Sequence, residues 1–155
     1  MQIRRATAAD AETVGQFAFE LFVELAAPAT PGYDMQKVIR TARQFLERGN
    51  SVWAFLAEEV DSPVALITLN ECASIYSGGH FGEICELYVR PPFRGGSVGT
   101  QLIDSAVDLA RERGWLRLEV GAPAVPQWQR TVAFYERYGF TTIGPRLKFE
   151  LLSGT

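Results

Sequence analysis

The residues best suited to chemistry lie between Glu83 and Thr100, near the middle of the chain. Two carboxylates, Glu83 and Glu86, stand on a strand-like run, and a carboxylate can act as a general base. The segment Arg94-Gly95-Gly96-Ser97-Val98-Gly99 follows and opens a helical pattern. Such a turn aims several backbone N–H groups at one spot, and the helix dipole adds positive charge there, so phosphate is its natural ligand. A plain connecting turn is the alternative interpretation.

Two familiar phosphate loops do not fit this segment. A P-loop requires the pattern G-x-x-x-x-G-K-[ST], and no lysine stands in this run to reach phosphates. A dinucleotide-binding loop requires G-x-G-x-x-G in the first strand–helix unit of a parallel sheet. Here the loop lies past mid-chain and follows strands that we expect to be antiparallel.

The elements that position this loop can be read from hydrophobic periodicity and from turn residues. Helical spacing predicts helices over 11–26, 34–48, 97–113 and 127–138. Strand-like runs predict strands over 3–6, 51–59, 64–70, 82–90, 115–120, 140–143 and 147–152, with a loop or bent strand over 73–81. Hairpins in the first half and strand–helix–strand units in the second predict an α/β fold with a mixed sheet and helices on both faces.

Composition limits the class of protein. The chain has 155 residues, 47% of them hydrophobic and 21% charged, which favours one globular domain over residues 1–155. A net charge of −3 argues against nucleic acid as a partner. No apolar run reaches the about 18 residues of a membrane span, and no signal core follows Met1, so we expect a cytoplasmic protein without a membrane partner. Cys72 and Cys85 have no zinc or disulfide spacing and predict reduced, largely buried thiols.

Two motifs carry a family resemblance. Arg94, Val98 and Gly99 match the acetyl-CoA signature of the GNAT superfamily of N-acetyltransferases, Arg/Gln-x-x-Gly-x-Gly/Ala. Ser97 stands where glycine is usual, and serine is acceptable there if its φ is negative. The segment 131–140 resembles the second hallmark, a helix that carries Phe/Leu-Tyr-Glu and ends in Gly-Phe. Trp128 replaces the Asn that often begins this helix.

The resemblance implies a GNAT acyl-CoA N-acyltransferase fold of about seven strands and about four helices, with acetyl-CoA as cosubstrate and no metal. It implies an acetyltransferase whose strand over 82–90 has a bulge and splays from its neighbour. The residues that it places at the cofactor are Leu87, Tyr88, Val89, Arg94, Gly95, Gly96, Ser97, Val98, Gly99, Thr100, Trp128, Thr131 and Tyr135.

Acetyl transfer to an amine needs a base, an oxyanion donor and an acid. By the resemblance, Tyr135 is the acid that protonates the leaving thiolate, and the alternative is a structural tyrosine. The backbone N–H of Val89 is the implied oxyanion donor. Glu83 falls where histone-acetylating relatives carry their base, whereas Glu86 lies closer to the expected acetyl group. The two carboxylates project to opposite faces of the strand unless the bulge intervenes, and water is an alternative base.

The sequence does not identify the acceptor, which is a small-molecule or protein amine. A catalytically silent CoA-binding sensor or interaction module of the same fold is the main alternative. A nucleotide-binding domain without acyl chemistry is another. Dimerisation is common among relatives of this kind, and the sequence neither requires nor excludes a homodimer.

Overall fold

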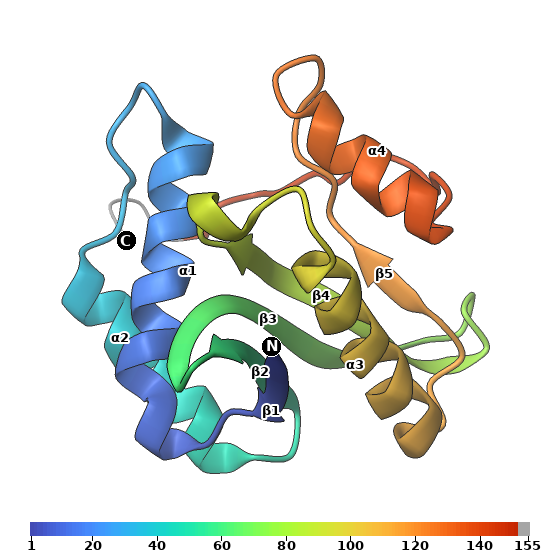
Figure 1. Cartoon of the computed structure of the whole chain (residues 1–155). Helices are drawn as coiled ribbons and strands as arrows, with labels where there is room; N and C mark the ends of the chain where they lie inside the picture. Colours follow the sequence, from blue (N-terminus) through green and yellow to red (C-terminus); the bar gives the residue numbers. More distant parts are fainter. Residues whose placement is uncertain (152–155) are drawn as a thin grey trace. The chain divides into compact units, whose positions relative to one another are not determined.

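A computed structural model of the chain describes residues 1–151. The chain forms two compact units, of which the first is Met1–Val120 and the second begins at Gly121. The first unit contains the sheet and three α-helices, and the second contains the helix α4, Gln129–Tyr138. Figure 1 labels these elements along the chain. None of the helices within residues 1–151 has the length and apolar character that a membrane span needs.

The sheet has five strands in the order β1-β2-β3-β4-β5. Their bounds are Gln2–Arg5 for β1, Val52–Glu59 for β2, Ser62–Ser74 for β3, Gly79–Val89 for β4 and Leu118–Val120 for β5. The first four pair antiparallel, and β5 runs parallel to β4 because α3 connects the two strands. The predicted mixed α/β sheet is therefore confirmed, with five strands in place of seven.

Both faces of the sheet are covered by helices. The residues of β3 from Val64 to Leu69 are all buried, and successive side chains of a strand point to opposite faces. The helix α1, Ala11–Ala26, packs Phe17 into a core cluster with Leu56, Leu66 and Tyr88 on one face. The helix α3, Val98–Arg113, contacts the same strands and buries its apolar side on the opposite face. The helix α2, Met35–Arg48, packs beside α1.

The predicted last two strands are wrong. Residues 140–143 and 147–151 form no strand in the structure, and residue 152 lies outside the described residues. The apolar residues of this segment are largely exposed, with Leu147 at 94% and Phe149 at 87%. Alternating apolar residues favour a strand, but a strand forms only where another strand pairs with it, and none among residues 1–151 pairs here. The segment 73–81, where we expect a loop or bent strand, has more strand than that, since β3 and β4 extend their hairpin into it.

Candidate functional site

The predicted anion loop lies between β4 and α3. A short 3₁₀ turn, Pro91–Phe93, follows β4, and α3 then begins at Val98 with Ser97 as its N-cap residue. Gly95 has a φ of +82°, in the left-handed region that side chains disfavour. A Cβ atom added to Gly95 or Gly96 would meet no other atom within 4 Å, so the space beside both glycines is open.

Most backbone amides of this loop have no acceptor among residues 1–151, although the N–H of Arg94 donates to Pro91 O at 3.2 Å. Among residues 1–151, the N–H groups of Gly95, Gly96 and Ser97 donate to no backbone carbonyl. The first helical bond of α3 runs from Gln101 N to Ser97 O at 2.9 Å, so the amides of its first turn also lack a helical acceptor. No side chain caps this end of the helix. Several N–H donors therefore remain available at the start of α3.

Ser97 fits the place of the usual glycine. Its φ of −95° is in the ordinary negative range, so the side chain causes no backbone strain. Its hydroxyl oxygen accepts a hydrogen bond from Gln101 Nε2 at 2.8 Å, which directs the hydroxyl along the helix. Serine in place of the usual glycine therefore does not disturb the backbone of the loop.

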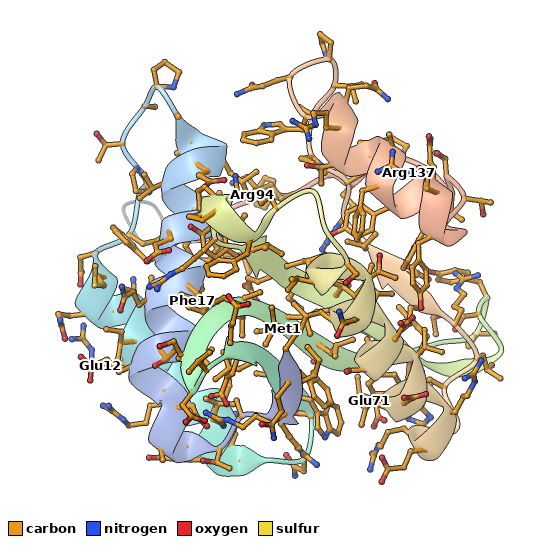
Figure 2. All side chains as sticks on the ribbon, viewed as in Figure 1. Met1, Glu12, Phe17, Glu71, Arg94 and Arg137 are labelled. Atoms are coloured by element: carbon orange, nitrogen blue, oxygen red, sulfur yellow. The ribbon has the colours of Figure 1, made fainter. Side chains whose placement is uncertain are left out.

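Arg94 connects the loop to two other elements. Its Nε donates to the carbonyl oxygen of Val89 at 2.6 Å, and its Nη2 pairs with Glu24 of α1 at 2.7 Å. The guanidinium also lies 5.5 Å from the ring centroid of Tyr88. Figure 2 shows Arg94 beside α1. Sequence reasoning missed Glu24 as a partner, because 70 positions separate it from Arg94.

The pairing between β5 and β4 ends well before the end of β4 at Val89. Their pairing covers Gly82 to Ile84 on β4, and no described strand pairs with the rest of β4 on this side. The N–H of Arg90 donates to Val64 O of β3 at 3.0 Å. Successive N–H groups of a strand point in alternate directions, so the N–H of Val89 faces away from β3, toward the open edge. This agrees with the splayed strand that the family resemblance implies.

A bulge in β4 brings the two candidate bases to one face of the sheet. Thr68 of β3 pairs with Glu86, whereas the next residue, Leu69, pairs with Ile84, so one residue of β4 is unmatched. Glu83 pairs with Asn70, two positions from Thr68 on β3. Thr68 and Asn70 are two apart on β3, so their side chains lie on the same face of the sheet. Directly paired residues also share a face, so Glu86 and Glu83 lie on that face too.

The unmatched residue of the bulge is Cys85, and this corrects one expectation. Neither cysteine forms a disulfide within residues 1–151, and Cys72 is half-buried, but Cys85 is exposed. Cys85 is exposed because the bulge takes it out of the regular alternation between buried and open faces.

The environment of Glu86 raises the pKa of its carboxyl group. Burial is the main cause, and the nearby charge of Glu83 acts in the same direction. A hydrogen bond with Thr68 opposes them by favouring the charged form. A half-buried carboxylate with a raised pKa is a better proton acceptor than an exposed one.

In the first unit, two of the residues predicted at the cofactor have buried side chains. Tyr88 is 5% exposed and packs against Phe17 with ring centroids 5.9 Å apart. Burial is the main cause that raises its pKa to about 12. Val98 is 7% exposed. Any contact of these two residues with a ligand therefore falls to their main chain. Leu87 and Val89 lie beside Tyr88 on β4 and are half-buried.

Tyr135 is a buried residue of α4 in the second unit. It is 7% exposed, and its ring lies 5.4 Å from the rings of Phe134 and Phe140. Burial raises its pKa to about 12. Within residues 1–151 no hydrogen bond of its hydroxyl is found, and no fully buried side-chain oxygen lacks a partner, so the hydroxyl reaches the surface. Among residues 1–151, therefore, this hydroxyl donates to no backbone carbonyl, and whether Tyr135 is the acid stays a prediction.

The other residues predicted on α4 stand at its beginning. Trp128 is the N-cap residue and half-buried, and its carbonyl oxygen accepts the N–H of Thr131 at 3.0 Å. Thr131 is also half-buried. The side chain of Trp128 does not cap the helix, as an asparagine in that position can.

Comparison with known proteins places these features in a family. The model of the acetyltransferase (GNAT) family matches residues 19–140. An uncharacterized N-acetyltransferase of Methanocaldococcus jannaschii is 29% identical over 125 residues, which are 77% of this chain and 54% of that protein. IAA acetyltransferase of Azospirillum brasilense is 36% identical over 75 residues, or 46% of each protein. The chain thus spans about half the length of these curated relatives.

A solved acetyltransferase structure has the same fold. The crystal structure of a predicted acetyltransferase with acetyl-CoA, from Clostridium acetobutylicum, superposes with a TM-score of 0.78 at 21% identity. The superposition covers 97% of this chain and 96% of that one. Because the family model matches well over half of the sequence, the chain belongs to the acetyltransferase (GNAT) family.

Proposed function

We propose that this chain is an N-acetyltransferase that moves the acetyl group of acetyl-CoA directly to an amine of a small molecule or a protein. The observation that carries the proposal is the set of backbone N–H groups from Gly95 to Thr100 that the protein leaves without acceptors among residues 1–151. These donors and the positive end of the α3 dipole suit a diphosphate, which is the most highly charged part of CoA outside its 3′-phosphate.

The open edge of β4 supports the position of the thioester. The pantetheine arm carries amides that can pair with strand main chain, and β4 beyond Ile84 offers such an edge. The N–H of Val89 faces this edge and would donate to the thioester oxygen as negative charge develops on it. Arg94 holds the carbonyl of the same residue, which fixes the peptide group that directly follows the donating one.

Proton transfer is assigned to three residues. Glu86, with Glu83 as the second candidate, accepts the proton of the amine directly or through water, since both lie on one face of the sheet. Tyr135 donates a proton to the leaving thiolate. Its raised pKa of about 12 keeps the phenol protonated at neutral pH, as an acid must be.

The reaction needs a base, an oxyanion donor and an acid, and side chains and amides can supply all three, so we propose a mechanism without a metal. The carboxylates of Glu83 and Glu86 favour an acceptor that arrives as a cation and is deprotonated in the site. We place the reaction in the cytoplasm, where thiols such as Cys72 and Cys85 stay reduced. A homodimer is compatible with this proposal but not required by it.

The test is a substrate screen with the purified chain. Release of free CoA is measured with acetyl-CoA and a panel of amines that includes amino acids, polyamines, aminoglycosides and peptides with free N-termini. Release that depends on one class of amine supports the proposal and identifies the acceptor. Tight binding of CoA with no release for any amine would instead favour a silent CoA-binding module. Binding of ATP or NAD as tight as that of CoA would favour a general nucleotide-binding domain.

A further inference from the structure

Thr68 is a buried polar residue in the apolar centre of β3. It is 7% exposed, and its neighbours from Val64 to Leu69 are apolar. A hydroxyl in such surroundings costs free energy unless it finds hydrogen-bond partners. A valine would fill nearly the same space without that requirement, so the hydroxyl calls for a specific reason.

Both partners of this hydroxyl belong to Glu86. The backbone N–H of Glu86 donates to Thr68 Oγ1 at 3.0 Å. The hydroxyl of Thr68 in turn donates to the carboxylate oxygen Oε2 of Glu86. One side chain on β3 therefore holds the main chain and the side chain of a single residue on β4.

These contacts lie at the bulge. The unmatched residue, Cys85, interrupts the ladder next to Glu86, and the amide of Glu86 takes the Thr68 side chain as its acceptor. A shift of one residue in this pairing would turn Glu86 to the opposite face of the sheet and reverse the amides that follow it. The Thr68 hydroxyl therefore binds β4 at the bulge, whose register sets the orientation of the residues that follow Glu86.

We propose that Thr68 is a positioning residue of the acetyl-transfer site, which holds the β4 bulge in register and thereby places the carboxylate of Glu86 and the amide of Val89. The inference rests on the proposed function in so far as it concerns acetyl transfer. The Thr68 hydroxyl contacts the proposed base, Glu86, and acts on the reaction through that residue.

The charged groups around Glu86 determine what the loss of Thr68 does. Glu83 shares its face of β4 and, with burial, raises the pKa of Glu86, whereas the Thr68 hydroxyl lowers it. The helix α3 packs on the opposite face. Other titratable groups on or beside this face include Glu20, Glu24, Tyr88, Arg94, Arg117 and Glu119. The hydroxyl is thus the group that opposes burial at Glu86.

Thr68→Val removes both hydrogen bonds and nearly conserves the volume. The pKa of Glu86 then rises further, so the base stays protonated up to a higher pH. The acid limb of the kcat/KM profile therefore shifts to higher pH. We expect kcat/KM at pH 7 to fall about tenfold, the usual effect of losing one hydrogen bond to a charged group. Thr68→Ser keeps the hydroxyl and should stay within about twofold of the parent. Thr41→Val, at an exposed threonine of α2, is the matched control.

A second readout does not depend on activity. The hydroxyl protects the Glu86 amide in the parent chain, so hydrogen exchange of this amide, followed by NMR, should be about tenfold or more faster in Thr68→Val and unchanged in Thr41→Val. If Thr68→Val does not fold, Thr68→Cys takes its place, because a thiol is a weak donor and acceptor of similar size.

The two readouts separate the two claims. Faster exchange together with a shifted acid limb supports the proposal. Exchange and kcat/KM that both match the parent in a folded Thr68→Val or Thr68→Cys would overturn it. If the parent chain transfers no acetyl group to any amine, the proposed function fails, and the exchange rate alone still decides whether Thr68 holds the bulge.

Discussion

The Nε of Arg94 donates a hydrogen bond of 2.6 Å to the carbonyl oxygen of Val89, and this bond ties the anion loop to the end of β4. The same guanidinium pairs with Glu24 of α1 at 2.7 Å. One side chain therefore connects the loop proposed to hold the diphosphate with the residue proposed to hold the thioester oxygen. In this structure Arg94 is an anchor of the site, and a contact with phosphate would come in addition.

Replacing Arg94 with lysine should weaken both functions of the site. Lysine keeps the charge but lacks the planar fork that reaches Val89 and Glu24 together. We expect the Kd for CoA to rise about tenfold and kcat to fall as well, as loss of a charged hydrogen bond implies. Calorimetry and initial rates measure the two effects. Arg111→Lys, at an exposed arginine of α3, is the matched control, and equal behaviour of the two variants would argue against an anchor.

Gly95 and Gly114 form a matched pair for testing the loop. Both have a left-handed φ, +82° and +71°, and at both a Cβ would meet no atom within 4 Å. Alanine at either position should lower the free energy of unfolding by about 1 kcal/mol, because both substitutions force a side chain into that region. Only Gly95→Ala should also weaken CoA binding, since it disturbs the amides that face the anion. Equal Kd values for the two variants would remove the loop from the binding site.

Tyr135→Phe should lower kcat by about 10²-fold with little change in the Kd for CoA, the loss expected for a general acid. Because the pKa of Tyr135 is about 12, its deprotonation should not lower the rate at any pH below about 10. Initial rates between pH 6 and 10 measure both. Tyr138→Phe, on the same helix, is the control. A kcat of Tyr135→Phe equal to that of the parent would contradict the role of Tyr135 as the acid.

Much of the fold was predictable because local patterns decide it. The helices over 11–26 and 34–48 follow their apolar spacing, and the structure has them at Ala11–Ala26 and Met35–Arg48. The strand pairing was not predictable at the end of the chain, where alternation over 147–151 has no partner strand among the described residues. Apolar periodicity reports what a segment prefers, and pairing depends on distant parts of the chain.

The site shows the same limit. The loop and its glycines were visible in the sequence, but the position of the bulge was not, because it depends on which residues of β3 and β4 pair. The common face of Glu83 and Glu86 follows from that pairing. The one signal of Thr68 in the sequence is a hydroxyl within the apolar run from Val64 to Leu69.

Glu86→Gln should abolish base catalysis and yet stabilise the fold at neutral pH. The pKa of Glu86 is raised above 4.5, so the folded chain holds a proton longer than the unfolded chain as pH rises. Its contribution to stability is therefore present below the ordinary pKa and is lost as pH rises through the raised one. Glutamine does not ionise and still offers Thr68 an acceptor.

The measurement for this variant is urea unfolding at pH 4 and pH 7.5. Relative to the parent, the free energy of unfolding of Glu86→Gln should increase between these two pH values. Glu47→Gln, at an exposed glutamate of α2, serves as the control. A difference between Glu86→Gln and the parent that stays constant with pH would contradict a buried, raised carboxyl group.

The central claim, that the amides at the start of α3 grip the diphosphate, is tested most directly by amide NMR of the chain with CoA and with pantetheine. The amide protons from Gly96 to Thr100 should move downfield with CoA, because they become hydrogen-bonded to phosphate, and should stay in place with pantetheine, which lacks it. If CoA binds while these amides remain unmoved, or if CoA does not bind at all, the account is wrong.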